Sequence, residues 1–320
     1  MKSMLNVIGM PIKHGQNKNG TQYSPVLLKT FMKQRPSLFK DSVINSAGKY
    51  ESYIDILKTE YNIHWVGNFH SNLIKQTEGN ISVPSASEIV SEQCEKVYDK
   101  ISSMRGVNIL GTKNLFIGGD HSMAIGSISS MLDIYKDDLK VIWIDAHADL
   151  NKPETSLSGS IHGQPLSYLM GHNTDYLEGP FKWLDRVHKL KPCNLHYMGL
   201  RDLDKYEIDT INELNINFYE SPLEIDTNKI LDEILSVSPE QKIHISLDVD
   251  ALCPKIAPST GTSVKDGITE SEIFSILDRI KQTGNLESLD VTEINPLLGT
   301  ADEVIKTLDI SSKCILKSFI

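Results

Sequence analysis

The stretch K-V-I-W-I-D-A-H-A-D, residues 140–149, decides the fold, because in it an apolar run passes directly into three chelating side chains. Val141–Ile144 has the length and the composition of a buried β-strand. Asp145, His147 and Asp149 follow it at once. In open α/β sheets, ligands bind beyond the carboxyl ends of the strands. The stretch therefore predicts a parallel strand that ends at a binding site.

Two further apolar runs end in polar clusters of the same kind. Leu115–Ile117 runs into G-G-D-H-S, which contains His121, and Lys242–Leu247 runs into D-V-D, which contains Asp248 and Asp250. Residues two apart in an extended chain point the same way, about 7 Å apart. We therefore expect the chelating residues of each cluster to face one pocket, with the small residues between them pointing away.

The rest of the chain alternates short β-type runs with longer amphipathic segments. Candidate strands lie at Leu5–Gly9, His64–Gly67, Leu115–Ile117, Lys140–Ile144, Asn194–Met198, Ile216–Tyr219, Lys242–Leu247 and Ser288–Val291. Candidate helices lie at Ser85–Ser103, Met123–Tyr135, Asp204–Leu214, Asn228–Val237 and Glu270–Thr283. This alternation predicts an α/β fold with a parallel sheet and helices on both faces. No composition break marks a linker, so we expect a single domain over residues 1–320.

Composition and charge exclude several classes of protein. The 320 residues carry a net charge of −10, with 40% hydrophobic and 23% charged residues. These values are ordinary for a soluble enzyme and argue against a nucleic-acid partner. No apolar run reaches the length of a membrane span, and no secretory signal is visible. The four cysteines are widely spaced without a C-x-x-C pair, so we expect reduced thiols and a cytoplasmic location.

The three clusters together supply two imidazoles and four carboxylates. Four converging carboxylates would repel one another without a cation, whereas two divalent ions would balance them. Ligands rich in carboxylate with some imidazole suit Mn²⁺. A lone aspartate after a strand is usually a helix cap or a turn residue, but three clusters with consistent chemistry favour a metal site. The sequence therefore predicts two Mn²⁺ ions per chain.

The clusters also resemble the signatures of the ureohydrolases, a family that includes arginases, agmatinases, guanidinobutyrases and formimidoylglutamases. The matching runs are G-G-D-H-S, D-A-H-x-D, and S-x-D-x-D with the later P-x-T-G-T. The resemblance implies a three-layer α/β/α fold with a central parallel sheet and a two-manganese centre. The ligands that it implies are His121, Asp145, His147, Asp149, Asp248 and Asp250.

Within that family, the loops beyond the metal signatures are most similar to those of arginases. Residues 149–165 resemble the arginase run D-I-N-x-P-x-T-x-x-S-G-N-x-H-G-x-P, which implies three neutral donors for a substrate carboxylate: Asn151, Ser156 and Ser158. Residues 200–207 resemble a second arginase run, in which Asp204, helped by Glu207, would meet the α-ammonium group. Such complementary ends suit a zwitterionic amino acid. Asn151 and Ser158 could instead be turn residues, and Asp204 a helix cap.

The same resemblance implies catalytic roles. His162 matches the arginase histidine proposed to shuttle protons, and Glu293 matches the glutamate that receives the guanidinium group, with Thr262 close to that pocket. A hydroxide that bridges the two ions would attack the guanidinium carbon, and Asp149 would help the metals to stabilise the tetrahedral intermediate. The function so implied is hydrolysis of L-arginine to L-ornithine and urea.

Alternatives remain open at this point. The substrate could be agmatine, a guanidino acid or formimidoylglutamate, or the chain could be a non-catalytic homologue. Cys253 stands where the family usually has aspartate, and Ser160 stands where arginases usually have asparagine, so support of the Asp250 loop and substrate recognition are affected. Residues 9–16 resemble the arginase opening and are expected at the pocket rim. The resemblance also suggests a homo-oligomer, either a trimer or a hexamer.

Overall fold

The computed structural model describes residues 2–34, 51–73, 75–77, 80–104, 111–173, 178–220, 227–236 and 240–320. Its centre is an eight-stranded sheet in which every neighbouring pair of strands is parallel. In spatial order the strands are β2 (Tyr61–Asn68), β1 (Ser3–Met10), β5 (Thr112–Gly118), β10 (Leu286–Thr292), β9 (Lys242–Asp248), β6 (Leu139–Ile144), β7 (Leu195–Leu200) and β8 (Asn217–Glu220). All eight expected strands are confirmed, with ends shifted by a few residues.

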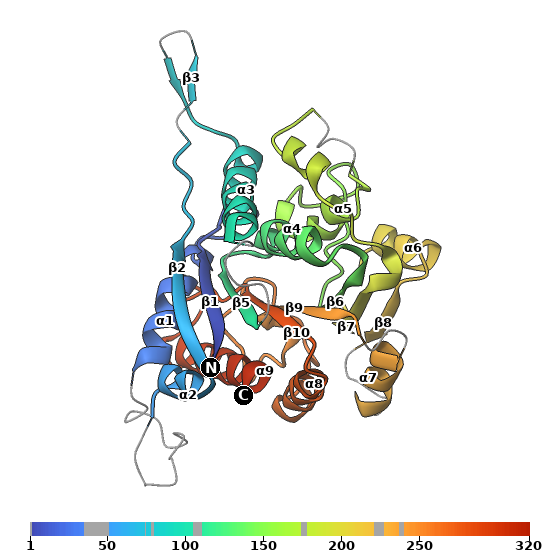
Figure 1. The fold of residues 1–320 in the computed structure, drawn as a ribbon. Coiled ribbons are helices and arrows are strands. Elements are labelled where there is room, and N and C mark those ends of the chain that lie inside the picture. Colours follow the sequence, from blue (N-terminus) through green and yellow to red (C-terminus); the bar gives the residue numbers. More distant parts are fainter. Residues whose placement is uncertain are drawn as a thin grey trace.

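Helices cover both faces of this sheet (Figure 1). One face packs against α3 (Ala86–Met104), α4 (Ala124–Tyr135), α5 (Pro165–Leu169) and α6 (Lys205–Glu213). The other face packs against α1 (Ser24–Lys33), α2 (Tyr53–Glu60), α7 (Thr227–Ser236), α8 (Glu270–Gln282) and α9 (Ala301–Phe319). The expected three-layer α/β/α architecture is therefore confirmed. Val237, which ends one expected helix, lies outside the described residues.

Five of these helices were expected from the sequence, whereas α1, α2, α5 and α9 were not. The signal for α9 was nevertheless present in its first turn. Thr300 caps the helix by accepting from the Glu303 backbone N–H, and the Glu303 side chain accepts from the Thr300 backbone N–H in return. This capping box satisfies two amide donors that the start of a helix leaves without partners. The short antiparallel hairpin formed by β3 (Lys75–Thr77) and β4 (Asn80–Ser82) was not expected either.

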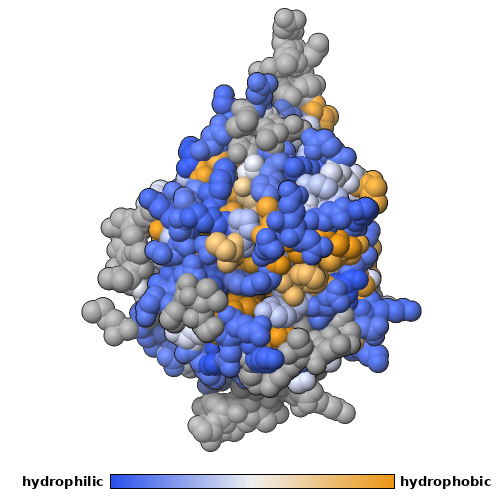
Figure 2. Space-filling view, turned by 90° about the vertical axis from the view of Figure 1, so that its right-hand side faces the viewer, coloured by the Kyte–Doolittle hydropathy of each residue, from blue (hydrophilic) through white to orange (hydrophobic). Residues whose placement is uncertain are grey.

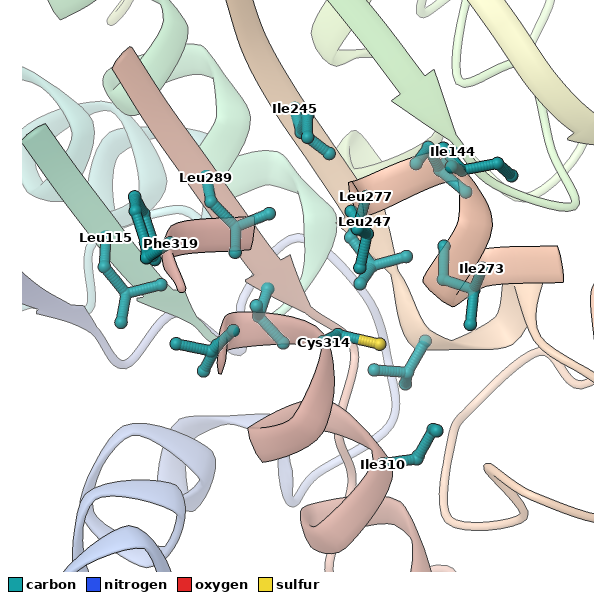
Figure 3. Close-up of a cluster of buried hydrophobic side chains, with 14 of the residues drawn as sticks. Leu115, Ile144, Ile245, Leu247, Ile273, Leu277, Leu289, Ile310, Cys314 and Phe319 are labelled. Atoms are coloured by element: carbon teal, nitrogen blue, oxygen red, sulfur yellow. The ribbon is translucent and has the colours of Figure 1, made fainter. Parts of the chain in front are cut away.

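The hydrophobic core on the α8–α9 face packs against the central strands, whose ends carry the predicted metal ligands. Figure 3 shows aliphatic side chains from the central strands meeting Leu277 of α8 and Cys314 and Phe319 of α9. Leu277 and Cys314 are fully buried, and Phe319 is nearly so. This packing buries the apolar faces of two amphipathic helices, which is the main source of helix stability in a globular protein.

The two edges of the sheet differ from its centre in exposure. β8 pairs only with β7 within the described residues, and three of its four side chains are exposed. Figure 2 shows the face at this end of the sheet, where hydrophobic side chains gather across a largely hydrophilic surface. Ile208 of α6 and Phe218 of β8 are among the exposed apolar side chains of the protein.

In the described part of the chain, none of the helices combines the length and apolar content needed to cross a bilayer.

The contrast between Leu277 and Ile208 gives a test of where the core lies. Leu277 is 0% exposed and Ile208 is 44% exposed. We expect Leu277→Ala to lower the free energy of unfolding by about 2–5 kcal/mol, because it removes buried methyl groups and leaves a cavity. Ile208→Ala should change it by less than about 0.5 kcal/mol. Urea unfolding followed by circular dichroism measures both, and equal effects of the two substitutions would contradict this assignment of the core.

Candidate active site

The four central strands deliver polar side chains to one place. β5, β10, β9 and β6 are neighbours in the sheet, and they are followed at their carboxyl ends by His121, Glu293, Asp250 and Asp145. Because all four strands are parallel, their carboxyl ends share one edge of the sheet. The sequence placed three of these clusters at strand ends, and the structure brings all of them together.

One group of metal-ligating atoms surrounds His121. Its Nδ1 lies 3.0 Å from Asp145 Oδ2, 3.1 Å from Asp149 Oδ2 and 3.2 Å from Asp248 Oδ2. One ligand atom from each of His121, Asp145 and Asp248 lies within 4.8 Å of the others, which is close enough to hold one metal ion. The imidazole is completely buried, and its Nδ1 makes no hydrogen bond of good geometry. A buried ring nitrogen without a hydrogen-bond partner is suited to bind a metal ion.

A second group shares Asp145 with the first. His147 Nδ1 lies 3.4 Å from Asp145 Oδ1 and 3.3 Å from Asp250 Oδ2. Asp145, His147 and Asp250 also place one ligand atom each within 4.8 Å of the others. Two groups joined by one carboxylate are the arrangement expected of a binuclear site. Five of the six predicted ligands therefore fall into these groups, and the sixth, Asp149, lies beside His121.

The electrostatics of the cluster also fit divalent cations. Burial raises the pKa of Asp149 to about 6, and the Asp145 carboxylate adds to the shift. Burial and the Asp250 carboxylate raise the pKa of Asp248 well above its usual range. Burial opposes a charged His147, but hydrogen bonds to Asp145 and Asp250 outweigh it and raise the pKa of His147 to about 12. Without metal, protons on the imidazoles balance part of the carboxylate charge. Bound cations would take over that role.

Asp248 is the last residue of β9, whereas turns beyond the strand ends aim the other ligands of these two clusters. Strand β6 ends at Ile144, and Asp145 to His147 lie in a bend, while Asp149 has a positive φ of 50°. Asp250 lies in the short 3₁₀ helix η8 (Val249–Ala251), and its N–H donates to Asp248 Oδ1 at 2.8 Å. The expectation that strand alternation points these side chains into one pocket was therefore wrong in its mechanism, although the side chains do converge. A turn brings carboxylates closer than the spacing of alternate strand residues allows.

A second set of contacts, which sequence analysis missed, orients the ligands. His121 Nε2 lies 2.9 Å from Ser246 Oγ, and that hydroxyl lies 3.4 Å from Asp290 Oδ2. The His121 ring stacks on Trp143, with ring centroids 4.1 Å apart. The Trp143 Nε1–H donates to Asp145 Oδ2 at 3.0 Å. Such outer contacts fix the orientation of metal-binding side chains. Ser246 and Trp143 each precede an aspartate ligand by two residues, which was the available signal.

A pocket of about 330 Å³ opens onto this cluster. Its lining includes three of the predicted metal ligands, His147, Asp149 and Asp248. Its walls include all six residues predicted to bind substrate, which are Asn151, Ser156, Ser158, Asp204, Glu207 and Thr262. His162 also lines it, together with Asp202, which sequence analysis did not single out. The residues predicted from separate loops therefore lie around one cavity.

Asp204 caps a helix, which is one of the roles that the sequence left open, and it also lines the pocket. It caps α6 by accepting from the Glu207 N–H at 3.0 Å, and Glu207 completes a capping box. Its other oxygen accepts from Asn151 Nδ2 at 2.7 Å at the pocket wall. Burial and the Asp149 carboxylate raise the pKa of Glu207 to about 7. The helix start thus presents acidic groups to the pocket.

Thr262 contacts a metal ligand as well as the pocket. Its hydroxyl donates to Asp250 Oδ2 at 2.7 Å. Since a predicted ligand accepts this hydrogen bond, Thr262 helps to fix the Asp250 carboxylate. The sequence placed Thr262 near the guanidinium pocket, but it gave no sign of this contact.

Glu293 lies behind the pocket and is almost fully buried. His162 Nδ1 lies 3.1 Å from its Oε1, and Gln16 Nε2 donates to both of its oxygens, at 2.9 and 2.7 Å. Burial opposes a charged His162, but the Glu293 carboxylate outweighs it and raises the pKa of His162 to about 9. Gln16 belongs to the segment expected at the rim, and the Gly15 carbonyl accepts from the His162 N–H at 3.1 Å. The segment therefore joins two of the three predicted catalytic groups, His162 and Glu293.

Comparison with known proteins identifies the family. The family model described as "Arginase family" matches residues 3–316. The chain belongs to the arginase family. A Plasmodium berghei protein named arginase is 34% identical over 94% of this chain and 85% of its own length. Arginase-1 of Rattus norvegicus is 33% identical over 98% of this chain and 92% of its own length.

Solved structures of arginase-family proteins share the fold over almost the whole chain. A crystal structure of Bacillus subtilis arginase is 28% identical, with a TM-score of 0.80 and coverage of 99% of this chain and 98% of that chain. Entamoeba histolytica arginase in complex with L-ornithine shares the fold with a TM-score of 0.79 at 23% identity, over 100% of this chain and 98% of that chain. Together with the named relatives, these matches support a hydrolase of the arginase type. Members of the family depend on metal, and the acidic and imidazole groups described above can hold it.

The protonated imidazoles of this arginase-family chain give a testable property of metal binding. His121 and His147 must lose protons before their ring nitrogens can bind a cation, and the pKa of His147 is raised to about 12 without one. Since the pKa of Asp248 is also raised, we expect at least two protons to be released as two ions bind near neutral pH. Affinity should rise as pH rises from about 6 to about 8.

Calorimetric titration of the metal-free protein with Mn²⁺, in buffers of different ionisation enthalpy, counts these protons. A parallel titration of Asp133→Asn serves as the control, because this half-buried carboxylate of α4 accepts from Ser102 and lies outside both metal-binding groups. Metal uptake with no dependence on pH or buffer would contradict this description of the metal-free site.

Proposed function

We propose that the protein is an arginase, which hydrolyses L-arginine to L-ornithine and urea at a binuclear manganese centre. One observation carries the proposal. A single pocket is lined by the predicted ligands His147, Asp149 and Asp248 together with Asp204 and neutral hydroxyl and amide donors. That combination offers a hydrolytic centre at one end and complementary groups for a zwitterion at the other. The relatives named arginase support the same conclusion.

We assign the six metal ligands as the sequence predicted them: His121, Asp145, His147, Asp149, Asp248 and Asp250. The donor set contains more carboxylates than imidazoles and no thiolate, which suits Mn²⁺ among the transition metals. When bound, the two cations would lower the pKa of a water molecule and so supply a nucleophile at neutral pH. The remaining steps depend on the chain's own side chains.

Glu293 would orient the guanidinium group. Its carboxylate is buried, and burial alone would raise its pKa, but His162 and other hydrogen-bond donors hold that pKa below its usual range. A buried carboxylate that stays ionised attracts a planar cation strongly. Gln16 now donates to both of its oxygens, so the amide would have to yield one of them to the substrate. The guanidinium carbon would then lie over the metal ligands in a fixed orientation.

His162 and Asp149 are suited to handle protons. With its pKa raised to about 9 by Glu293, against the effect of burial, His162 carries a proton at neutral pH and can give it to the leaving amine of ornithine. Asp149, with its pKa raised to about 6 by burial and by Asp145, can accept a proton near neutral pH. Both side chains line the pocket, so both can reach a bound substrate. We propose these two as the proton-transfer groups.

Asp204, Glu207, Asn151, Ser156 and Ser158 would bind the amino-acid end of the substrate. Asp204 and Glu207 place negative charge where an α-ammonium group can approach. Ser156 is half-buried and Ser158 is exposed, both line the pocket, and their hydroxyls lie 3.5 Å apart. Two hydroxyls so placed can donate to the two oxygens of a carboxylate. The loop would therefore bind the α-carboxylate, which arginine has and agmatine lacks.

We further propose one catalytic domain over residues 1–320, acting in the cytoplasm as a homo-oligomer, either a trimer or a hexamer. The four cysteines are free, which suits a reducing compartment. Light scattering coupled to size-exclusion chromatography measures the oligomeric state, and a monomeric mass would contradict this part of the proposal.

A substrate panel tests the proposed function. We expect Mn²⁺-loaded protein to release urea from L-arginine with a kcat/KM about 10²- to 10⁴-fold above that for agmatine, because agmatine leaves the carboxylate donors unpaired. Ser158→Ala should lower kcat/KM for arginine and leave that for agmatine unchanged. If agmatine were hydrolysed as efficiently as arginine, the arginase assignment would fail, while amidine hydrolysis would stand.

Asp204→Asn tests the α-ammonium site without removing the helix cap, since asparagine caps helices about as well as aspartate. We expect KM for arginine to rise about 10- to 100-fold, the value of a hydrogen bond to a charged group. The KM for 5-guanidinopentanoate, which is arginine without its α-amino group, should stay unchanged. Asp209→Asn, on the exposed side of the same helix, is the matched control. Equal effects on the two substrates would remove Asp204 from the ammonium site.

A further inference from the structure

Arg201 lies in the loop between β7 and α6, and all of its guanidinium donors are used. Nε donates to the Lys265 carbonyl at 2.8 Å. Nη1 donates to the carbonyls of Gly199 and Ala251, at 3.0 and 3.2 Å. Nη2 donates to the carbonyls of Asp250 and Val264, at 2.6 and 3.1 Å. A guanidinium group has five N–H donors, so each of them here meets a different backbone carbonyl.

These carbonyls belong to segments that carry one metal group in particular. Asp250 supplies both a ligand carboxylate and a carbonyl to Arg201. The Arg201 backbone N–H also donates to the Ala146 carbonyl at 2.9 Å, between the ligands Asp145 and His147. Arg201 therefore contacts both segments that supply the group formed by Asp145, His147 and Asp250. Its side chain contacts the Asp250 segment, and its backbone N–H contacts the segment between Asp145 and His147. No hydrogen bond joins its side chain to the His121 segment among the described residues.

The charge of Arg201 is held without a carboxylate partner. Within the described residues, no aspartate or glutamate oxygen lies within 4.0 Å of its guanidinium nitrogens. Cys253, which stands where the family usually has aspartate, comes two residues after Ala251 in the same loop. Burial lowers the pKa of Arg201, while the nearby Asp250, Asp145 and Asp248 carboxylates oppose that change. The positive charge thus lies behind the carboxylates of the metal site and offsets part of their repulsion.

We propose that Arg201 is a positioning residue for the metal ion held by Asp145, His147 and Asp250, and that it acts much less on the ion held by His121, Asp145 and Asp248. The inference rests on the proposed binuclear site. Arginine is required because its planar group satisfies five carbonyls in fixed directions, whereas lysine offers three donors from one nitrogen. Replacing Arg201 would remove hydrogen bonds to this loop, so the loop would hold Asp250 less firmly. The ion held by Asp145, His147 and Asp250 would then bind less tightly.

Metal stoichiometry tests this without relying on activity. Metal-free wild-type protein and Arg201→Lys are titrated with Mn²⁺ by calorimetry, and bound metal is counted after desalting. We expect two ions per wild-type chain. In Arg201→Lys one ion should bind as in wild type, while the Kd of the other rises about 10- to 100-fold, the usual effect of removing a group that supports a metal ligand. Arg201→Gln, which also removes the charge, should weaken the second ion at least as much.

Arg279→Lys is the matched control, because Arg279 of α8 forms an exposed ion pair with Asp232 of α7. It should bind two ions with wild-type affinities. Unchanged binding in Arg201→Lys, equal weakening of both ions, or failure of both Arg201 variants to fold even with metal would overturn the inference. Wild-type protein that takes up a single ion would contradict the proposed function and this inference with it. If wild-type protein bound two ions and Arg201→Lys bound them with the same affinities, only the inference about Arg201 would be contradicted, and the proposed function would stand.

Discussion

Four aspartate carboxylates, those of Asp145, Asp149, Asp248 and Asp250, lie buried within one small region at the carboxyl edge of the sheet. Their mutual repulsion in a medium that screens poorly is the constraint to which the surrounding structure responds. His121 and His147 bring donors against these oxygens, and Arg201 places a fixed positive charge behind them. The cluster is therefore stable only with protons or cations in place, which links protonation, metal binding and folding in this protein.

The scaffold can bear this repulsion because the ligands come from the ends of the central strands. β5, β10, β9 and β6 are held by neighbours on both sides, and apolar side chains cover both of their faces. Ligands attached to such strands cannot easily move apart. The loops that would contact substrate lie further out, with Ser158 exposed and Asp204 at the start of a helix. Burial thus decreases from the metal ligands to Ser158, as suits a site that must admit and release a small molecule.

Several side chains near the pocket have two roles at once. Asp204 caps a helix and faces the pocket, and Thr262 lines the pocket while it donates to a ligand carboxylate. Glu293 adopts a positive φ of 62°, a conformation unusual for a residue with a side chain, where it is tied to His162 and Gln16. Backbone strain of this kind persists only where surrounding contacts enforce it. Substitutions here therefore need a control that separates the structural role from the functional one.

The sequence by itself determined the strands and the chemistry at their ends. Val141–Ile144 is buried on both sides of the sheet, so its apolar composition was a sufficient signal, and the chelating residues followed directly. Helix α9 was not predicted, although Thr300 and Glu303 at its start carry the residue pattern of a capping box. The alternation expected of Asp145, His147 and Asp149 was also wrong, since turn geometry depends on backbone torsions that composition does not reveal.

Only the tertiary structure decided which distant groups meet at the site. Gln16 and Glu293 lie 277 residues apart in the sequence and are joined by hydrogen bonds. Arg201 meets carbonyls of Asp250 and Lys265, and backbone carbonyls are the same chemical group at every position, so no residue pattern marks those that will accept. Local sequence specifies which side chains and strands are present. The order of strands in the sheet and the packing of loops over its edge decide which of them come within hydrogen-bonding distance.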